Sequence, residues 1–262
     1  ARAPTKRQTV QHQPIPVPQK PTPQQSMPSS SQGDLGEPTP PSEIVTEAML
    51  GSSISSKDWK VRVQCYGLLS ELLSKRLSRN KGARGKIEGD SILENLDGVV
   101  ASMAEDTNVG ALDKALEFLI LYADSCKMAG EADHAASITQ SLVKKNALSS
   151  RPSTLKLAND LALKLIEVGR DGASSAHSVV EVLISQGLKS RKPKVVLASA
   201  SLIRSVGVEF GVAVLPLHLV DAAIPQILSN PNAKVRETGL NILADLCRAL
   251  SKDSFEKILE QM

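Results

Sequence analysis

Aromatic residues are scarce in this 262-residue chain, which has one tryptophan, two tyrosines and three phenylalanines, together 2% of its residues. β-Sheets draw heavily on aromatic and β-branched side chains, so a β-sandwich or β-barrel is disfavoured. Packing of helix on helix can instead be built from leucine, alanine, valine and isoleucine. The scarcity of aromatics therefore favours an all-α fold.

Cysteine is also rare. Cys65, Cys126 and Cys247 lie far apart, each within an apolar helical pattern, and no CxxC or CxxH spacing occurs. We therefore expect no structural zinc site and no other cofactor. The three thiols are expected to be free and buried, in a protein of a reducing compartment.

Long apolar runs and catalytic motifs are missing as well. No run reaches the roughly 20 residues needed to cross a bilayer, and no signal peptide is recognisable, so we expect an intracellular protein without a membrane partner. The motifs GxxxxGK[ST], GxGxxG and HExxH are absent, and no histidine lies within a catalytic constellation. An enzyme is not expected. Because the first residue is Ala1 and not methionine, we expect a segment of a longer protein.

The chain divides into two regions of different composition. Residues 1–41 hold ten of the fifteen prolines, many glutamines and serines, and almost no periodic apolar residues. Such a segment buries too little surface to offset the entropy lost on ordering, so we expect a disordered linker. From Ser42 the pattern changes to helical spacing broken by short loops, which predicts one folded domain over residues 42–262.

A repeat emerges when the second helix of each predicted helix pair is aligned. Five helices begin their apolar stripe at one aligned position, and the stripe continues seven and eleven residues later, on the same face of an α-helix. The first positions are Val61, Val109, Leu155, Val195 and Val235. The later ones are Leu68, Leu116, Ala162, Leu202 and Ile242, then Leu72, Ile120, Ile166, Val206 and Leu246.

The repeat spacing predicts the architecture. Successive first positions are separated by 48, 46, 40 and 40 residues, close to the ~40–47 residues of HEAT repeats. We therefore predict an all-α solenoid of about six HEAT-like helix pairs forming a flat paddle, with the sixth pair beginning at Lys252. Stacked pairs bury a continuous core and expose long edges of loops, which suit recognition of a large partner.

The loops inside the pairs carry the candidate binding residues. Trp59, the only tryptophan, begins a helix between Lys57 and Lys60, and an aromatic residue flanked by cations is typical of an interface anchor. Positive charge recurs at equivalent places in later repeats, although the net charge of the chain is only +3. The candidate residues along this edge are Trp59, Lys60, Asn108, Arg151, Lys192, Lys194, Lys234 and Arg236. A basic ridge attracts an acidic partner.

Several of these loops resemble those of a known family. Residues 57–62, Lys-Asp-Trp-Lys-Val-Arg, resemble the Trp-Lys-x-Arg signature that opens the first repeat of TOG domains in microtubule polymerases. Residues 106–109 are similar to the second repeat, residues 192–195 to the fourth and residues 234–237 to the fifth. Four such motifs in order, in register over roughly 42–250, identify the chain as a member of this family. The third loop, Ser150 to Thr154, departs most from the pattern.

The resemblance implies binding of a free αβ-tubulin dimer along the loop edge, in a protein that regulates microtubule plus-end growth. Trp59 and Asn108 would then contact β-tubulin, and Lys192, Lys194, Lys234 and Arg236 would reach toward α-tubulin. The expected location is the cytoskeleton, at microtubules, the spindle, and the centrosome or spindle pole. Further TOG domains are expected in the same full-length chain.

Other functions stay open at this point. A CLASP-like microtubule stabiliser has the same features. A helical-repeat nucleic-acid binder would be more basic and would interleave aromatic side chains for stacking, so a nucleic-acid partner is not expected. A scaffold repeat would leave Trp59 and the edge charges without a role.

Overall fold

The computed structural model describes residues 52–80, 96, 99–126, 132–145, 147–169, 172–252, 255–256 and 259. Within these residues every regular element is helical, as the aromatic-poor composition predicts. The predicted linker over residues 1–41 lies outside the described residues, and so does most of the segment from Lys252 onward that was predicted to begin a sixth pair.

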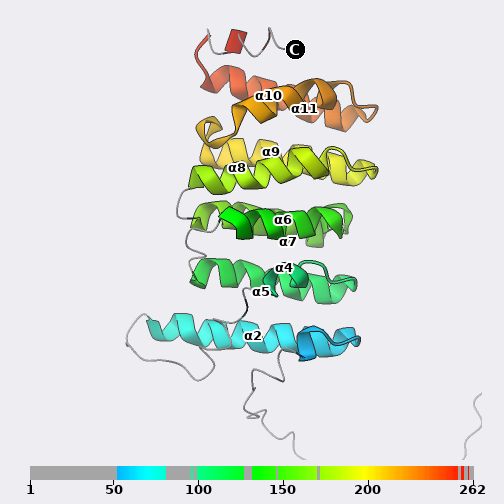
Figure 1. Ribbon diagram of the computed structural model, residues 1–262, viewed down its shortest axis with the longest axis vertical. Coiled ribbons are helices and arrows are strands. Elements are labelled where there is room, and N and C mark those ends of the chain that lie inside the picture. The colour runs from blue at the N-terminus through cyan, green and yellow to red at the C-terminus, as the bar shows by residue number, and fades with distance from the viewer. Residues whose placement is uncertain are drawn as a thin grey trace, which may run out of the picture. The chain divides into compact units, whose positions relative to one another are not determined.

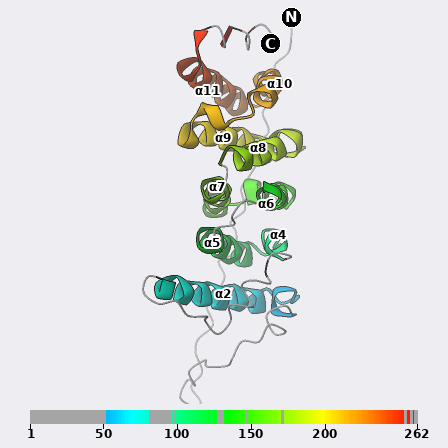
Figure 2. The same cartoon turned by 60° about the vertical axis from the view of Figure 1, so that its left-hand side comes forward.

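The helices form two layers (Figure 2). One layer consists of the five helices aligned in the sequence: α2 (Trp59–Asn80), α5 (Val109–Cys126), α7 (Pro152–Val168), α9 (Pro193–Phe210) and α11 (Ala233–Ala249). The other consists of α4 (Val100–Met103), α6 (Ala132–Lys144), α8 (Gly172–Val182) and α10 (Leu217–Leu228). Short helical turns follow three of these elements: η1 (Ala147–Ser149), η2 (Leu183–Gly187) and η3 (Val212–Val214).

Successive pairs stack on one another. In the first layer α2 packs against α5, α5 against α7 and α9 against α11; in the second, α4 packs against α6 and α6 against α8. The turn η1 packs against both α7 and α9. This is the stack of helix pairs that the repeat predicts.

The core follows the predicted stripe most closely in the later repeats. Both α9 and α11 bury all three of their aligned residues; in α9 these are Val195, Leu202 and Val206. In α2 the stripe is displaced, because Leu69 and Leu73 are buried while Leu68 and Leu72 are only half-buried. The stripe was therefore predicted one residue out of phase in the first repeat.

Val109 is a clearer correction. It was predicted to open the apolar stripe of the second repeat, but 40% of its surface is exposed. Val109 is the first residue of α5, beside the loop, and the buried face of α5 begins with Ala111 and Leu112. A residue in the first turn of a helix has no preceding turn to cover it, so an aligned apolar residue there need not belong to the core.

The predicted burial of the thiols is only partly right. Cys65 is buried, and this burial raises the pKa of its thiol to about 11. Cys247 is exposed, on the same side of α11 as the exposed Arg236 and Leu240. The side chain of Cys126 lies outside the described residues.

The α8 segment ends in a π-helical turn, η2, which packs against α9. Gly187 ends this turn, and a Cβ atom added to it would lie 2.2 Å from Ser199 Oγ and 2.8 Å from Ser199 Cβ. Only glycine fits there, because real Cβ atoms do not approach other atoms so closely. The turn leads directly into the loop before α9, so this contact helps to fix where that loop begins.

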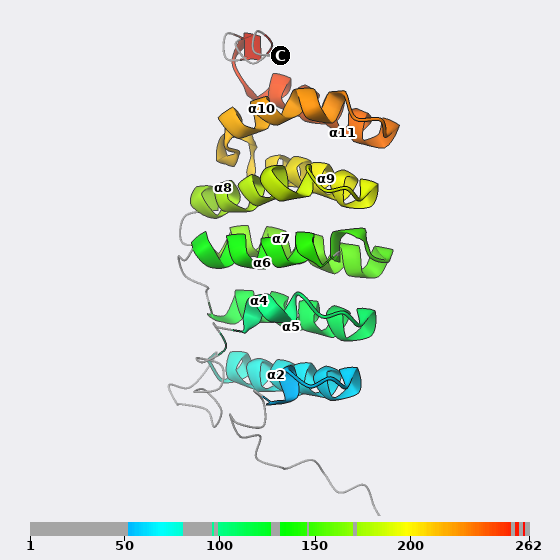
Figure 3. The ribbon, with the colours of Figure 1, turned by 45° about the vertical axis from the view of Figure 1, so that its right-hand side comes forward.

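The loops inside the pairs lie along one edge of the stack, on the right in Figures 1 and 3. We name them loop 1 (residues 55–58), loop 2 (104–108), loop 3 (147–151), loop 4 (188–192) and loop 5 (229–232), and together the loop edge. Among the described residues, no helix is long and apolar enough to cross a membrane. In the same part of the chain, no three His, Cys, Asp or Glu side chains are grouped so that they could hold a metal ion.

Candidate functional site: the loop edge

All eight candidate residues lie at the loop edge, at or next to the start of a helix of the first layer. Trp59 and Lys60 begin α2, Asn108 precedes α5, and Arg151 precedes α7. Lys192 precedes α9 and Lys194 is its second residue, while Lys234 and Arg236 lie in the first turn of α11. The structure therefore brings together, on one edge, residues that span 178 positions of sequence (236 minus 59, plus one).

Trp59 is the largest exposed apolar side chain at this edge. It is the first residue of α2 and 42% of its surface is exposed. Lys60 follows it and is exposed as well. A tryptophan costs little conformational entropy to immobilise and offers a large area to a partner, so an exposed one is suited to anchor an interface.

Three kinds of hydrogen bond hold loop 1 in place. Ser56 Oγ accepts a hydrogen bond from the backbone N–H of Asp58 at 3.2 Å. Asp58 Oδ1 in turn accepts from the N–H of Lys60 at 2.9 Å, which caps the start of α2. Finally, Arg62 Nη1 donates to the carbonyl oxygens of Ser56 at 2.7 Å and Lys57 at 3.2 Å. We name this arrangement, an arginine side chain bound to two carbonyl oxygens of the loop before it, an arginine clamp.

Loop 5 has the same three kinds of hydrogen bond 174 residues later (230 minus 56). Asn230 Oδ1 accepts from the N–H of Asn232, and Asn232 Oδ1 accepts from the N–H of Lys234, both at 3.0 Å. Arg236 Nη1 donates to the carbonyl oxygens of Asn230 at 2.8 Å and Pro231 at 3.0 Å. The guanidinium of Arg236 is thus bound to its own loop, although the residue is exposed.

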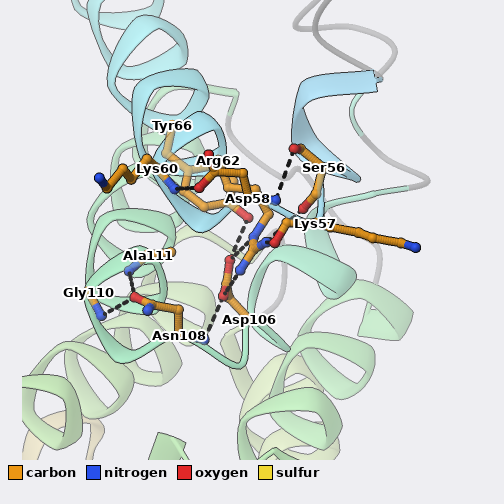
Figure 4. Close-up of polar contacts among 10 residues, drawn as sticks. All are labelled: Ser56, Lys57, Asp58, Lys60, Arg62, Tyr66, Asp106, Asn108, Gly110 and Ala111. Carbon is orange, nitrogen blue, oxygen red and sulfur yellow. Dashed lines mark hydrogen bonds and ion pairs between the residues drawn. The ribbon is translucent and has the colours of Figure 1, made fainter.

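The clamp of loop 1 also reaches the next repeat (Figure 4). Arg62 Nε and Nη2 donate to the two carboxylate oxygens of Asp106 in loop 2, at 2.6 and 2.7 Å. The side chains of this pair are 13% and 2% exposed. The hydrogen bond to Asp106, opposed by burial, raises the pKa of Arg62, so the guanidinium stays charged.

Two further groups bind the same carboxylate. The N–H of Asn108 donates to Asp106 Oδ1 at 2.8 Å, and the hydroxyl of Tyr66 donates to Asp106 Oδ2 at 3.3 Å. Burial, and next the charge of Asp106, raise the pKa of the Tyr66 hydroxyl, which keeps it a donor. Asp106 is therefore a fully engaged buried carboxylate that ties loop 2 to α2.

Asn108 caps α5. Its Oδ1 accepts from the N–H of Gly110 at 3.0 Å and of Ala111 at 3.1 Å, so the amide oxygen is occupied by its own helix. Arg151 is similarly engaged, because its Nη2 lies 2.5 Å from Asp113 Oδ2 on α5. Thr154 donates to the other oxygen of Asp113. Asn108 and Arg151 both lie at the edge, as predicted. Asn108 also caps α5, and Arg151 also connects the start of α7 to α5.

Loop 4 is built differently. Ser190 Oγ accepts from the N–H of Lys192 at 3.2 Å, as in loops 1 and 5. However, Lys192 provides no side-chain cap for α9, and Val196 stands where loops 1 and 5 have their clamping arginines. Pro193 opens the helix instead, where its missing N–H costs nothing. The exposed cations Arg191, Lys192 and Lys194 therefore cluster at this loop.

Two grooves flank loop 2. One, of about 300 Å³, lies between loops 1 and 2 and is lined by residues that include Ser56, Tyr66 and Thr107. The other, of about 290 Å³, lies between loops 2 and 3 and is lined by residues that include Thr107, Val109 and Ser150. Glu105, Asp106 and Thr107 of loop 2 line both grooves. The end of the edge nearest α2 is therefore contoured, with apolar groups at Trp59 and Val109.

Comparison with protein families decides what kind of domain carries this edge. Residues 46–262 match the family described as XMAP215/Dis1/CLASP, TOG domain. The chain belongs to this TOG-domain family. The resemblance seen in the loop motifs is thereby confirmed.

Curated relatives of this TOG domain share about a quarter of its residues. Protein MOR1 of Oryza sativa subsp. japonica is 24% identical over 209 residues, which cover 79% of this chain and 10% of MOR1. Spindle pole body component alp14 of Schizosaccharomyces pombe is 26% identical over 210 residues, covering 79% of this chain and 24% of alp14. The chain thus spans a quarter or less of the length of these relatives.

Solved structures show the same fold. A structure described as concerning TOG-tubulin binding specificity superposes with a TM-score of 0.63 at 18% identity, over 80% of this chain and 75% of the other. The Drosophila melanogaster Mini spindles TOG3 structure gives a TM-score of 0.59 at 14% identity, over 83% and 88% of the two chains. The stack of helix pairs is therefore the TOG-domain fold.

Sequence reasoning missed the residues that build the frame of this TOG edge. Arg62 and Asp106 stand within the motifs but were given no role, and Asp113 was not assigned as a partner of Arg151. One signal was present: the dipeptide Val-Arg occupies the same aligned position in the first turns of α2 and α11, as residues 61–62 and 235–236. The partner carboxylates could not be found in this way, because they lie about 40 residues from their arginines.

Proposed function

We propose that this chain binds the αβ-tubulin dimer through its loop edge. Membership of the TOG-domain family supports this, together with a fold shared with a structure described as concerning TOG-tubulin binding. The family model covers both XMAP215 and CLASP proteins, so a CLASP-like stabiliser remains the alternative within the same binding role.

The observation that carries the proposal is the exposure of Trp59. The chain has a single tryptophan, and it lies at the head of α2 on the loop edge, 42% exposed, and outside the buried core. Burying an indole at a contact is among the largest single contributions to association. In the proposed complex, Trp59 inserts against β-tubulin, with Lys60 and Asn108 beside it.

The opposite end of the edge supplies charge. Lys192, Lys194 and Lys234 are exposed at the starts of α9 and α11. Together with Arg236 they are proposed to face α-tubulin, while Arg151 lies between the two ends. A row of cations raises the rate of encounter with an acidic partner and makes binding sensitive to salt.

The wider role is that of a module in a longer protein. Because the chain spans 24% or less of its curated relatives, we propose that it works with further TOG domains to regulate growth at the microtubule plus end. The relatives named mini spindles and spindle pole body component favour a location at the spindle and its poles. We propose a binding role and no catalysis.

Size-exclusion chromatography with purified αβ-tubulin tests the proposal. The chain should co-migrate with tubulin as a one-to-one complex at low salt and less so at moderate salt. Trp59→Glu should abolish the shift. No shift of the folded wild-type chain at any salt concentration would overturn the proposal.

Val208→Glu is the matched control. Val208 is another exposed apolar residue, 61% exposed, near the end of α9 and therefore away from the loop edge. The substitution adds the same charge as Trp59→Glu to the same fold. It should leave the complex intact, which separates loss of the contact from a general effect of added negative charge.

A further inference from the structure

Loops 1 and 2 share one buried ion pair. Arg62 contacts the backbone of loop 1 with one nitrogen and the carboxylate of Asp106 with the other two. Asp106 in turn binds the N–H of Asn108, the residue that caps α5. The backbone just before Trp59 and the backbone at Asn108 are therefore joined through one guanidinium and one carboxylate (Figure 4).

The geometry leaves little freedom in this connection. A bidentate guanidinium–carboxylate pair fixes orientation as well as distance, and burial removes competing water. Asp106 is 2% exposed and the nearby hydroxyl of Tyr66 binds it from α2. Arg62 is 13% exposed, and all three of its guanidinium nitrogens are already bonded within the chain, so we expect its effect on binding to be indirect.

We propose that Arg62 is a positioning residue for partner binding: through Asp106 it joins loops 1 and 2 into one rigid surface that presents Trp59 and Asn108 together. This rests on the proposed tubulin-binding function. A surface that is ordered before binding loses less entropy on association than two loops that move independently. Affinity therefore depends on a residue that does not touch the partner.

Loop 5 shows what the clamp does without the carboxylate. Arg236 holds the carbonyls of Asn230 and Pro231 in its own loop, with the same spacing as in loop 1. Among the described residues, it has no carboxylate partner in a neighbouring repeat. Replacing Arg236 should loosen one loop, whereas replacing Arg62 should loosen two.

Amide hydrogen exchange of the free chain tests the connection without tubulin. In Arg62→Lys, exchange should accelerate at the amides of Asp58 and Asn108, in both loops. In Arg236→Lys, acceleration should stay within loop 5. If Arg62→Lys accelerates exchange only in loop 1, the two loops are not joined and the proposal is wrong.

Tubulin affinity tests the consequence for binding. Arg62→Lys should weaken binding by about tenfold, the cost of ordering one or two groups at an interface. Arg204→Lys is the control, because Arg204 pairs with Asp245 at 2.8 Å between α9 and α11, away from the loop edge. It should lose no affinity, and it should lose less thermal stability than Arg62→Lys because the Arg204–Asp245 pair is more exposed. Equal affinities of the wild type and folded Arg62→Lys would overturn the proposal.

A second variant covers the case in which Arg62→Lys does not fold. Asp106→Asn retains an oxygen that can accept from Asn108 but loses the charge that orients Arg62. It is measured by the same exchange and affinity experiments, and the same outcomes decide. If the wild-type chain itself does not bind tubulin, the proposed function fails, and the exchange experiment still decides whether Arg62 joins the loops.

Discussion

Loop 1 and loop 5 contain the same turn in two different surroundings. Each has a polar side chain that accepts a hydrogen bond from the N–H two residues ahead, and a residue that caps the helix. Each also has an arginine that binds the carbonyl oxygens five and six residues before it. In loop 1 the arginine is 13% exposed and pairs with the buried Asp106, whereas Arg236 in loop 5 is exposed. A local hydrogen-bond pattern thus specifies the turn, and the neighbouring repeat decides how firmly the turn is held.

The largest expected effect comes from removing the carboxylate. Asp106→Ala should lower the free energy of unfolding by about 3–5 kcal/mol, because it leaves the mostly buried guanidinium of Arg62 unpaired. Asn230→Ala in loop 5 removes only one acceptor of a backbone N–H and should cost about 1 kcal/mol. Urea unfolding followed by circular dichroism at 222 nm measures both. Equal losses would mean that the two loops are held equally.

The second comparison concerns binding and not stability. Trp59→Ala should weaken tubulin binding by ~2–4 kcal/mol with little dependence on salt, because the lost contact is apolar. Lys194→Ala and Lys234→Ala should each cost less than about 1 kcal/mol, and the loss should shrink as salt rises. Fluorescence anisotropy titrations at two salt concentrations separate these outcomes. A strongly salt-dependent effect of Trp59→Ala would contradict an anchoring role for the indole.

The caps should behave alike at the two ends. Asp58 and Asn232 accept the N–H two residues ahead at 2.9 and 3.0 Å, so Asp58→Ala and Asn232→Ala should each cost about 1 kcal/mol. The difference between the two costs should be small, because both caps are near the surface. Thermal melts of the two variants and the wild type measure it. A much larger cost at Asp58 would show that the ion pair of loop 1 also stabilises its cap.

The smallest expected effect is a pH dependence in α10, the helix before loop 5. Oδ1 of Asp221 is buried without a hydrogen-bond partner among the described residues, and burial, opposed by His218, raises the pKa of this carboxyl. An acid with a raised pKa in the folded state stabilises the fold at low pH, and that contribution is lost as pH rises through the raised value.

Asp221→Asn should therefore be more stable than the wild type at pH 7, by about 0.5 kcal/mol because the carboxyl is only partly buried. The advantage should shrink as pH falls toward the ordinary value of 3.8. Urea midpoints of both proteins between pH 7 and pH 4 measure it. A constant difference across this range would rule out titration of Asp221 as the cause.

Much of the fold could be predicted, because its determinants are local and periodic. The apolar spacing located the five helices of the first layer, and Pro152 and Pro193 marked the first turns of α7 and α9. The phase failed at Val109, where an apolar residue at a helix start is exposed. Periodicity reports which face a residue occupies but not whether a neighbouring turn covers it.

The sequence predicted that the candidate residues share one edge, but it did not predict their hydrogen bonds and ion pairs. The apolar pattern located the helix starts, and for this reason Trp59 and the lysines could be assigned to the loop edge in advance. The pairing of Arg62 with Asp106 and of Arg151 with Asp113 joins residues 44 and 38 positions apart. Such contacts depend on how one repeat is placed on the next, which no single repeat specifies. The sequence therefore did not distinguish Arg236, bound to its own loop, from a lysine that extends into solvent.

The close approach of Gly187 to Ser199 has a consequence for how this domain can diverge. A methyl group at position 187 would overlap the Oγ and Cβ of Ser199, so substitution at either position alone can only keep or worsen the fit. Removing the serine side chain with Ser199→Gly would make room for Gly187→Ala. The two positions are thus epistatic: an alanine at 187 becomes acceptable only in a lineage that has already lost the side chain at 199.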